Sequence, residues 1–129
     1  MGRRGLTLSS DPPSLEELAR HLTVDLTTTG RRSGRLSRIE IWWFHVGDHF
    51  YITGTPGPRD WYANILADPK VVIHIGGLDL EGVAYPVLDT ATRAEVFDHP
   101  KTRWYSTQAE RQRLIDQAPM VEIVLNILG

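Results

Sequence analysis

Short segments of alternating apolar and polar residues dominate the first third of the chain. The segment 23–29, TVDLTTT, is rich in β-branched residues and places Val24 and Leu26 on one face, which predicts a first strand. The segment 36–46 alternates in its first half, whereas its second half, WWFHV, is apolar on both faces. We therefore expect a second strand whose end is covered on both sides, by the core and by a helix, a ligand or a partner.

Four further segments have the composition of strands. Gly47-Asp48 is a two-residue hairpin signal, so the chain should return directly and place His45 across from Phe50. A glycine and a proline in a later segment, GVAYP, indicate a bulge or an edge position. These four predicted strands cover residues 49–54, 70–75, 79–88 and 120–128.

Helical spacing occurs between these strands. A Ser-x-x-Glu capping box predicts a short helix over about residues 14–21. The segment DWYANILAD predicts a helix over 60–68, with Asp60 as its N-cap and an Asp-Pro pair at its end. Residues 91–117 are helical in pattern but are interrupted by the His-Pro pair at 99–100, which predicts two helices.

Most of the six predicted strands are joined as sequential hairpins, with helices inserted after the third and the fifth. This order favours a mainly β, α+β fold in which an antiparallel sheet curls into a small barrel with helices packed outside. The chain has 129 residues, which is the size of one domain. We expect a flexible N-terminal tail at residues 1–13 and a single domain at residues 14–129.

Composition narrows the classes of function. The hydrophobic fraction of 41% and the charged fraction of 23% are ordinary for a folded soluble protein, and no apolar run could span a bilayer. A net charge of −2 argues against non-specific nucleic-acid binding. The charged start is not followed by the long apolar segment of a signal peptide, so we expect a cytoplasmic protein. Because cysteine is absent, redox chemistry would have to come from a cofactor.

Neither a metal site nor a hydrolase is favoured. His45 and His49 have a spacing that converges on a helix, but the turn between them separates their side chains. Ser33 lies in a loop without an evident histidine and acid partner, and the chain has no G-x-S-x-G elbow. Structural histidines account better for this pattern, and we expect no bound metal.

The bend GRRSGR is the first candidate site. Three arginines bring guanidinium groups to one turn, and the backbone amides around the glycines can form a concave nest that suits a phosphate. The alternative is a solvated hairpin tip. In a binding site, Arg31 and Arg32 should act on ligand affinity and not on the fold. The bend consists of Gly30, Arg31, Arg32, Ser33, Gly34 and Arg35.

A second candidate site precedes the predicted helix 60–68. The segment TGTPGPRD puts small residues, two prolines and Arg59 before a helix N-terminus, whose free amides favour an anion. The alternative is an ordinary helix whose Trp61 belongs to the core. Two basic sites beside paired strands suggest a long anionic ligand with a flat apolar part. Aromatic residues could stack on that part or could simply be core: Trp42, Trp43, Tyr51, Trp61, Trp104 and Tyr105.

Three stretches resemble the deazaflavin-dependent nitroreductase family, relatives of the pyridoxamine phosphate oxidase-like flavin-binding split barrels. They are LTTTGRRSGRLSRIEIWW, GDHFYITGTPGPRDWYANILADPKVVIHI and the late MVEIVL, so the resemblance covers roughly residues 22–128. Its most specific part is the pairing of T-x-G-R-x-S-G with W-Y-x-N-x-x-A-x-P about thirty residues later. The resemblance implies a six-stranded antiparallel split β-barrel with helices packed outside.

The resemblance also implies that the barrel holds coenzyme F420, a deazaflavin with a phosphodiester and an oligoglutamate tail; FMN is the alternative cofactor. In the family, the bend and the residues before the W-Y-x-N helix grip the phosphate and tail. The corresponding residues are Gly30, Arg31, Arg32, Ser33, Gly34, Arg35, Pro58, Arg59 and Trp61. The ring would lie near Thr53, Gly54, Thr55 and Asn64.

The family places aromatic residues from the segment before the last strand over the substrate, which implies catalytic roles for Trp104 and Tyr105. We therefore expect an oxidoreductase that passes a hydride from reduced F420 to a flat electron-poor acceptor, such as a quinone, enone or nitro compound. The alternatives are an FMN-dependent oxidoreductase of the same fold and a non-catalytic carrier of a flavin or another anionic ligand. We also expect a homodimer, in which the partner subunit covers Trp42 or Phe44 on the second apolar face of strand 36–46.

Overall fold

The computed structural model describes residues 14–126, and the predicted tail at 1–13 lies outside the described residues. Its strands are β1 (Thr23–Thr29), β2 (Leu36–Trp42), β3 (Phe44–Val46), β4 (His49–Thr53), β5 (Lys70–Ile75), β6 (Leu78–Pro86) and β7 (Met120–Leu125). Its helices are α1 (Leu15–Ala19), α2 (Asp60–Ala67), α3 (Thr90–Asp98), the 3-10 helix η2 (Pro100–Thr107) and α4 (Arg111–Gln117).

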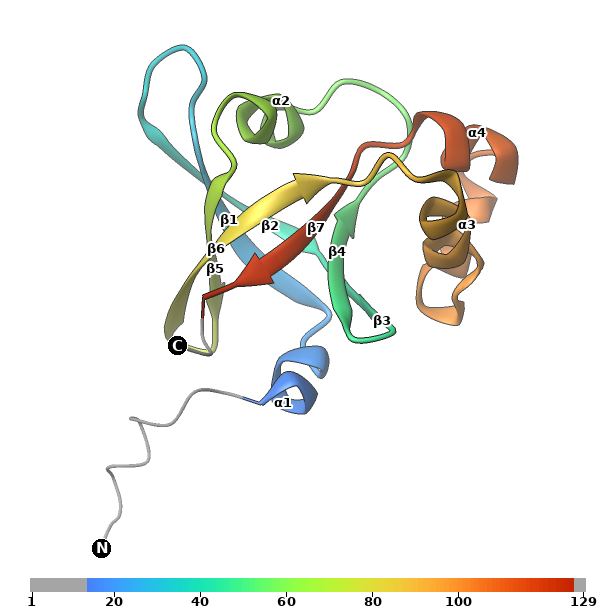
Figure 1. The fold of residues 1–129 in the computed structure, drawn as a ribbon, viewed down its shortest axis with the longest axis horizontal. Coiled ribbons are helices and arrows are strands. Elements are labelled where there is room, and N and C mark those ends of the chain that lie inside the picture. Colours follow the sequence, from blue (N-terminus) through green and yellow to red (C-terminus); the bar gives the residue numbers. More distant parts are fainter. Residues whose placement is uncertain (1–13, 127–129) are drawn as a thin grey trace, which may run out of the picture.

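The strands form one antiparallel sheet in the order β2-β1-β5-β6-β7-β4-β3. The sheet curls until β2, at one edge, comes close to β4, but these two strands are not neighbours in the sheet order (Figure 1). The result is a barrel that is split along β2. The helices lie outside it, so the predicted mainly β antiparallel barrel with outer helices is confirmed. None of the helices within residues 14–126 is long and apolar enough to cross a membrane.

The hairpin between β3 and β4 has the predicted register. His45 pairs with Phe50, and Gly47 has a φ of +58°, in the left-handed region that a tight turn requires. The two histidines on either side of this turn therefore do not converge. Inside the part of the chain that the structure describes, no group of three or more acidic or histidine side chains could hold a metal ion.

The predicted strand 36–46 is divided at Trp43, so the sheet has seven strands and not six. The Trp43 indole is only 2% exposed, and its Nε1 donates to the backbone oxygen of His21 at 2.9 Å. Its amide donates to Leu22 instead of continuing the ladder with β1. A buried indole needs a hydrogen-bond acceptor, and this bond ties the break between β2 and β3 to the segment before β1.

Two helix predictions change in detail. Helix α2 begins after Arg59, which is the N-cap in an extended conformation, whereas Asp60 is the first helical residue; the predicted Asp60 cap is therefore wrong. The break at residues 99–100 is confirmed, but the region forms three helices because η2 follows the break. The capping box of α1 is present, with Ser14 and Glu17 each accepting from the other's backbone amide.

Two hydrophobic cores lie on opposite faces of the sheet. The larger core fills the barrel, with Leu18 of α1 and Ile65 of α2 packed into it. The second core joins the outer face of β3, β4 and β7 to α3, η2 and α4. The end of strand 36–46 is covered at Trp43, which belongs to the first core, and at Phe44, which belongs to the second, but Trp42 remains 44% exposed.

The buried side chain of Arg93 holds α3, α4 and the end of β6 together. Its guanidinium donates to the backbone oxygens of Val87 at 2.8 Å, Ala118 at 2.6 Å and Ile115. Burial lowers the pKa of Arg93, against weaker effects of nearby acidic groups. The carbonyl groups at the end of α4 have no intrahelical donors, so this arginine supplies the hydrogen bonds that they need.

Candidate functional site

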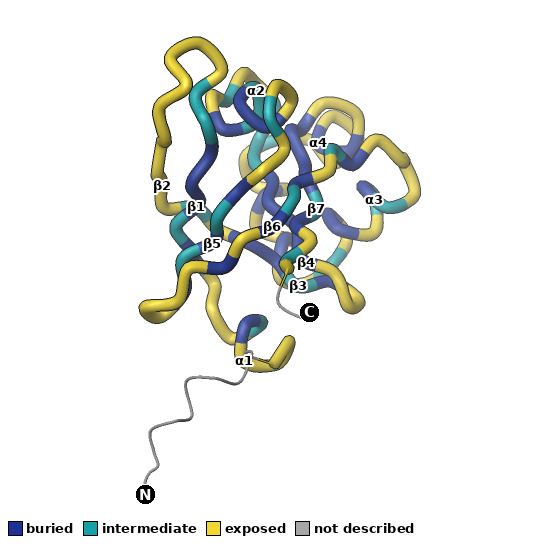
Figure 2. The backbone as a smooth tube through the Cα atoms, turned by 60° about the vertical axis from the view of Figure 1, so that its left-hand side comes forward, coloured by how far each residue is buried: buried dark blue, intermediate teal, exposed yellow. Residues whose placement is uncertain are grey.

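The bend between β1 and β2 is exposed at the tip of a hairpin and is closed by its own hydrogen bonds (Figure 2). The Gly30 amide donates to Arg35 O at 2.7 Å, and the Gly34 amide donates to Gly30 O at 2.9 Å. Gly34 has a φ of +72°, which favours glycine. Among residues 14–126, the amides of Arg32 and Ser33 have no protein acceptor, so only part of the predicted amide nest is free for a ligand.

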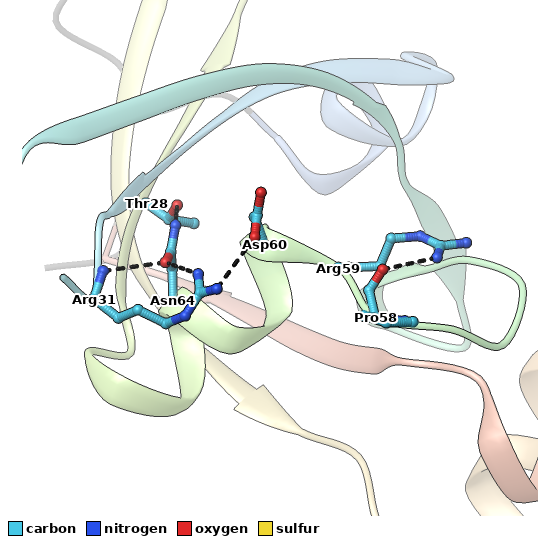
Figure 3. A network of polar contacts seen from close by, with 6 residues as sticks. All are labelled: Thr28, Arg31, Pro58, Arg59, Asp60 and Asn64. Atoms are coloured by element: carbon cyan, nitrogen blue, oxygen red, sulfur yellow. Dashed lines mark hydrogen bonds and ion pairs between the residues drawn. The ribbon is translucent and has the colours of Figure 1, made fainter. Parts of the chain in front are cut away.

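The Asn64 side chain fastens this bend to α2. It is 4% exposed, and its Oδ1 accepts from the Arg31 amide at 3.1 Å and from Arg31 Nη1 at 2.8 Å. Its Nδ2 donates to Thr28 Oγ1 at 3.1 Å. Figure 3 shows Arg31 running along α2 toward this amide. The sequence implied that Asn64 lies beside a ring, whereas three of its hydrogen bonds are already made within the protein.

The three arginines of the bend differ in their surroundings. Arg31 also pairs with Asp60 at 3.2 Å through Nη2, so its guanidinium is held on α2. The guanidinium groups of Arg32 and Arg35 make no hydrogen bond or ion pair within residues 14–126. The expectation that both Arg31 and Arg32 act on affinity alone therefore needs revision, because Arg31 has a role in the fold.

The loop that connects β4 to α2 is braced from within by Arg59. The Arg59 guanidinium donates to Thr55 O at 3.0 Å, Thr55 Oγ1 at 2.9 Å and Pro58 O at 3.1 Å. In Figure 3, Arg31 and Arg59 lie toward opposite ends of the drawn network, with Asp60 between them. At the start of this loop, the Thr53 hydroxyl donates to Pro119 O at 2.6 Å. A Cβ on Gly54 would lie 3.6 Å from Arg59, so the loop packs closely on this guanidinium.

The inward face of β2 is open beside this loop. Ser37 pairs with buried Thr28 and Ile39 pairs with buried Leu26, so both side chains face the barrel interior. Even so, Ser37 is exposed and Ile39 is 37% exposed. The split in the barrel therefore exposes polar and apolar surface between the bend and the loop before α2. Trp61, by contrast, is buried in the barrel core and is not at this opening.

Tyr105 and Trp104 lie on η2 with different exposures. Tyr105 is 4% exposed, and its hydroxyl donates to Thr53 O at 3.2 Å. Burial raises the pKa of Tyr105 to about 12, against a smaller opposing effect of Arg59. Trp104 stacks on the Tyr105 ring at a centroid distance of 3.9 Å and remains partly exposed. Tyr105 therefore links the two segments: its ring stacks on Trp104 and its hydroxyl is bonded to the end of β4.

Trp104 forms an apolar groove with Trp42, which the sequence offered only as one of several residues that could stack on a ligand or belong to the core. The two indole centroids are 5.9 Å apart. The groove has a volume of about 380 Å³, and its lining is completed by Leu22, Phe44 and Lys101. The run of apolar residues on both faces of strand 36–46 indicated that an apolar surface needs a cover there. It did not show which of these residues would remain exposed.

Replacement of Arg31 and of Arg32 by alanine separates the fold role from a ligand role. We expect Arg31→Ala to lower the free energy of unfolding by about 1 to 2 kcal/mol, because it removes the side-chain donors to Asn64 and Asp60. Arg32→Ala should change the same quantity by less than about 0.5 kcal/mol. Urea denaturation of both variants measures the difference, and equal stabilities would show that the Arg31 contacts contribute nothing.

Comparison with known proteins gives one family match and several structures of the same fold. The family model described as F420H(2)-dependent quinone reductase matches residues 15–125. The curated proteins contain no match. An F420H2-dependent reductase structure has a TM-score of 0.60 at 18% identity, covering 81% of this chain and 95% of its own.

Two further structures have the same fold. A Clostridium acetobutylicum protein related to general stress protein 26, of the pyridoxinephosphate oxidase family, has a TM-score of 0.63 at 12% identity, with 84% and 78% coverage. A domain-swapped dimer has a TM-score of 0.60 at 18% identity, with 81% coverage of each chain. The resemblance to the deazaflavin-dependent split barrels is confirmed, and the family's cofactor is F420. The chain belongs to the F420H2-dependent quinone reductase family.

Proposed function

We propose that this protein transfers a hydride from reduced F420 to a flat, electron-poor acceptor, with quinones as the leading class. The observation that carries the proposal is the position of Arg32 and Arg35, whose guanidinium groups have no partner within residues 14–126, on a bend that Asn64 fixes to α2. The family assignment supports F420 over FMN. An enone or a nitro compound remains an alternative acceptor within the same reaction class.

The residues of the bend fit the anionic part of F420. Arg32 and Arg35 carry charge that no carboxylate within residues 14–126 neutralises, and the Arg32 and Ser33 amides are free to donate. Charge-assisted hydrogen bonds from such groups to a phosphate or a carboxylate are about twice as strong as neutral ones. We assign the phosphate and the glutamate tail to this bend, with Gly30, Ser33 and Gly34 shaping it.

Strand β2 connects the bend to the aromatic groove. It runs from Leu36, next to Arg35, to Trp42, which corresponds to a rise of about 20 Å. A long ligand held at the bend would lie beside the split of the barrel and extend toward Trp104. The loop from Thr53 to Arg59 borders the same opening, so we keep Gly54 and Thr55 in the proposed ring site.

The chain's own residues would then orient the reactants and exclude water. F420 supplies the hydride when it is bound. Trp42 and Trp104 offer apolar surface on which a flat acceptor can stack, and Lys101 places an ammonium group at the edge of the groove. A cation there would stabilise negative charge that develops on an acceptor oxygen. Because the Tyr105 hydroxyl is bonded to Thr53 O, we assign Tyr105 a positioning role.

The activity itself tests the proposal. Reduced F420 is mixed with the protein and a soluble quinone, and the visible absorbance of oxidised F420 is followed. We expect enzyme-dependent reoxidation that saturates with quinone concentration. Binding of F420 without turnover of any quinone, enone or nitro compound would favour the carrier alternative, and a flavin spectrum in the purified protein would favour FMN.

Arg32 should determine cofactor affinity without affecting the fold. We expect Arg32→Ala to raise the dissociation constant of F420 about tenfold or more, because it removes a charge-assisted hydrogen bond of roughly 1.5 to 3 kcal/mol. The affinity of the wild-type protein should fall as salt concentration rises. Fluorescence titration measures both effects. Arg113→Ala is the matched control, because Arg113 is an exposed arginine on α4, and an Arg32→Ala variant that binds as tightly as this control would contradict the assignment.

Replacement of Trp42 should weaken binding of the acceptor and leave binding of the cofactor unchanged. We expect Trp42→Ala to raise KM for a quinone at least fivefold, an effect on the order of 1 kcal/mol for the loss of one stacking surface. The dissociation constant of F420 should remain within a factor of two of the wild-type value. Steady-state kinetics and titration give the two numbers. A variant with an unchanged KM and weakened F420 binding would place the acceptor elsewhere.

A further inference from the structure

A polar cluster that the cofactor site does not use lies on the outer face of the sheet. It is built on the neighbouring strands β1, β5 and β6 (Figure 1). His74 of β5 pairs with Asp79 on one side and with Asp25 on the other, and Thr27 lies on the same face of β1 as Asp25. Leu26, between these two residues of β1, points the other way into the barrel core.

Three side chains of this cluster are joined in a relay of hydrogen bonds. Thr27 Oγ1 lies 2.7 Å from His74 Nε2, and His74 Nδ1 lies 2.6 Å from Asp79 Oδ1. A carboxylate only accepts hydrogen bonds, so Nδ1 carries the proton, and Nε2 of the neutral imidazole accepts from the threonine hydroxyl. A hydroxyl that donates to a base, which a carboxylate in turn orients, is arranged as an activated nucleophile.

No local motif marks this relay in the sequence. Its histidine lies 47 positions from Thr27, on another strand of the sheet. Ser33, the hydroxyl that the sequence offered for hydrolase chemistry, accepts from the Arg35 amide within the bend and takes no part in the relay. The sheet therefore supplies, at Thr27, the histidine and acid partners that Ser33 lacks.

The relay borders a hollow of the size that holds a small ligand. Its volume is about 440 Å³, and Thr27 and His74 are among its lining residues. A second hollow of about 470 Å³ continues it and shares Thr27, Leu36, Val72 and Glu81 with it. The leucine and the valine offer apolar surface, whereas Glu81 disfavours an anion. The hollow therefore suits an uncharged molecule with an apolar part.

Arg38 places a positive charge beside the relay. It pairs with Thr27 across β1 and β2 and lines the first hollow. Its Nε donates to Asp25 Oδ2 at 2.8 Å, whereas its two Nη groups have no acceptor among residues 14–126. A guanidinium next to the nucleophile stabilises the negative charge that develops on a carbonyl oxygen under attack.

We propose that Thr27 is the nucleophile of a second site, which hydrolyses small, uncharged carboxylic esters. Thr27 Oγ1 forms a bond to the ester carbonyl carbon while its proton passes to His74 Nε2, and Asp79 stabilises the imidazolium. The bond from this carbon to the leaving oxygen then breaks, and the leaving group takes the proton and departs as an alcohol. A water molecule attacks the acyl-threonine in the same way, which releases the acid and restores the hydroxyl.

This site and the proposed cofactor site lie on opposite faces of β1. Thr28, the next residue along the strand, is bonded to Asn64 on the inner side, whereas Thr27 faces the outer hollows. The two reactions share no residue. Loss of ester hydrolysis with intact F420 binding and turnover would refute this site alone, and the converse result would refute the cofactor function alone.

Hydrolysis of p-nitrophenyl acetate by the full chain at neutral pH tests the proposal. We expect turnover that saturates with ester concentration. Thr27→Val removes the hydroxyl and should lower kcat/KM about a hundredfold or more, whereas Thr27→Ser keeps a nucleophile and should stay within about tenfold of the wild type. Acid quenching followed by peptide mass spectrometry should find the acetyl group on Thr27 of the wild-type protein.

His49 provides the matched control. Its Nδ1 is bonded to Glu122 Oε2 at 2.6 Å, but in the described part of the chain no hydroxyl is bonded to its Nε2. An exposed imidazole can attack an activated ester by itself, and His49→Gln measures that contribution. We expect His49→Gln to keep the saturable rate of the wild type.

Three results would overturn the proposal. The first is a wild-type protein whose rate does not saturate, the second is a rate that His49→Gln lowers and Thr27→Val does not, and the third is an acetyl group found only on other residues. Melting temperatures show whether each variant is folded. If Thr27→Val does not fold, the rate of Thr27→Ser and the position of the acetyl group on the wild type decide the question.

Discussion

The buried amide of Asn64 is the constraint on which the candidate site depends. A buried side-chain amide must find hydrogen-bond partners, and that of Asn64 finds them in β1 and in the bend that follows it. The bend is otherwise an exposed hairpin tip, of the kind that moves freely in many proteins. Because one residue of α2 is bonded to both Thr28 and Arg31, hydrogen bonds join the bend, β1 and the helix into one unit.

This unit explains why Arg31 has a structural role while the neighbouring arginines of the bend, unpaired within residues 14–126, remain free to bind a ligand. Arg31 is used by the protein, since its guanidinium completes the contacts of Asn64 and meets Asp60. Arg32 and Arg35, at the same end of β2, have no ion pair in the part of the chain that the structure describes. The aromatic groove lies at the other end of that strand, where Tyr105 ties Trp104 to the end of β4. A cofactor with its anionic tail at the bend and its ring at the loop before α2 would leave this groove for the acceptor.

The sequence predicted the elements because their signals are local. The hairpin register that sets His45 across from Phe50 follows from two turn residues, and the capping box of α1 follows from four consecutive positions. The family motifs paired the bend with the W-Y-x-N helix, and the structure brings these two segments together through Arg31 and Asn64. What could not be predicted depends on contacts between distant segments. The break at Trp43 follows from a bond to His21, and the tie between Arg31 and Asn64 joins residues 33 positions apart.

The central claim is that Asn64 acts on the cofactor by holding the arginine bend, although it does not touch Arg32. A double-mutant cycle tests it, with the dissociation constant of F420 measured for the wild type, Arg32→Ala, Asn64→Ala and the double variant, each folded at the temperature used. If Asn64 positions Arg32, the double variant should bind more tightly than additivity predicts, with a coupling of about 1 kcal/mol or more. Effects that add within about 0.3 to 0.5 kcal/mol would contradict the account, because the two residues would then act on the cofactor separately.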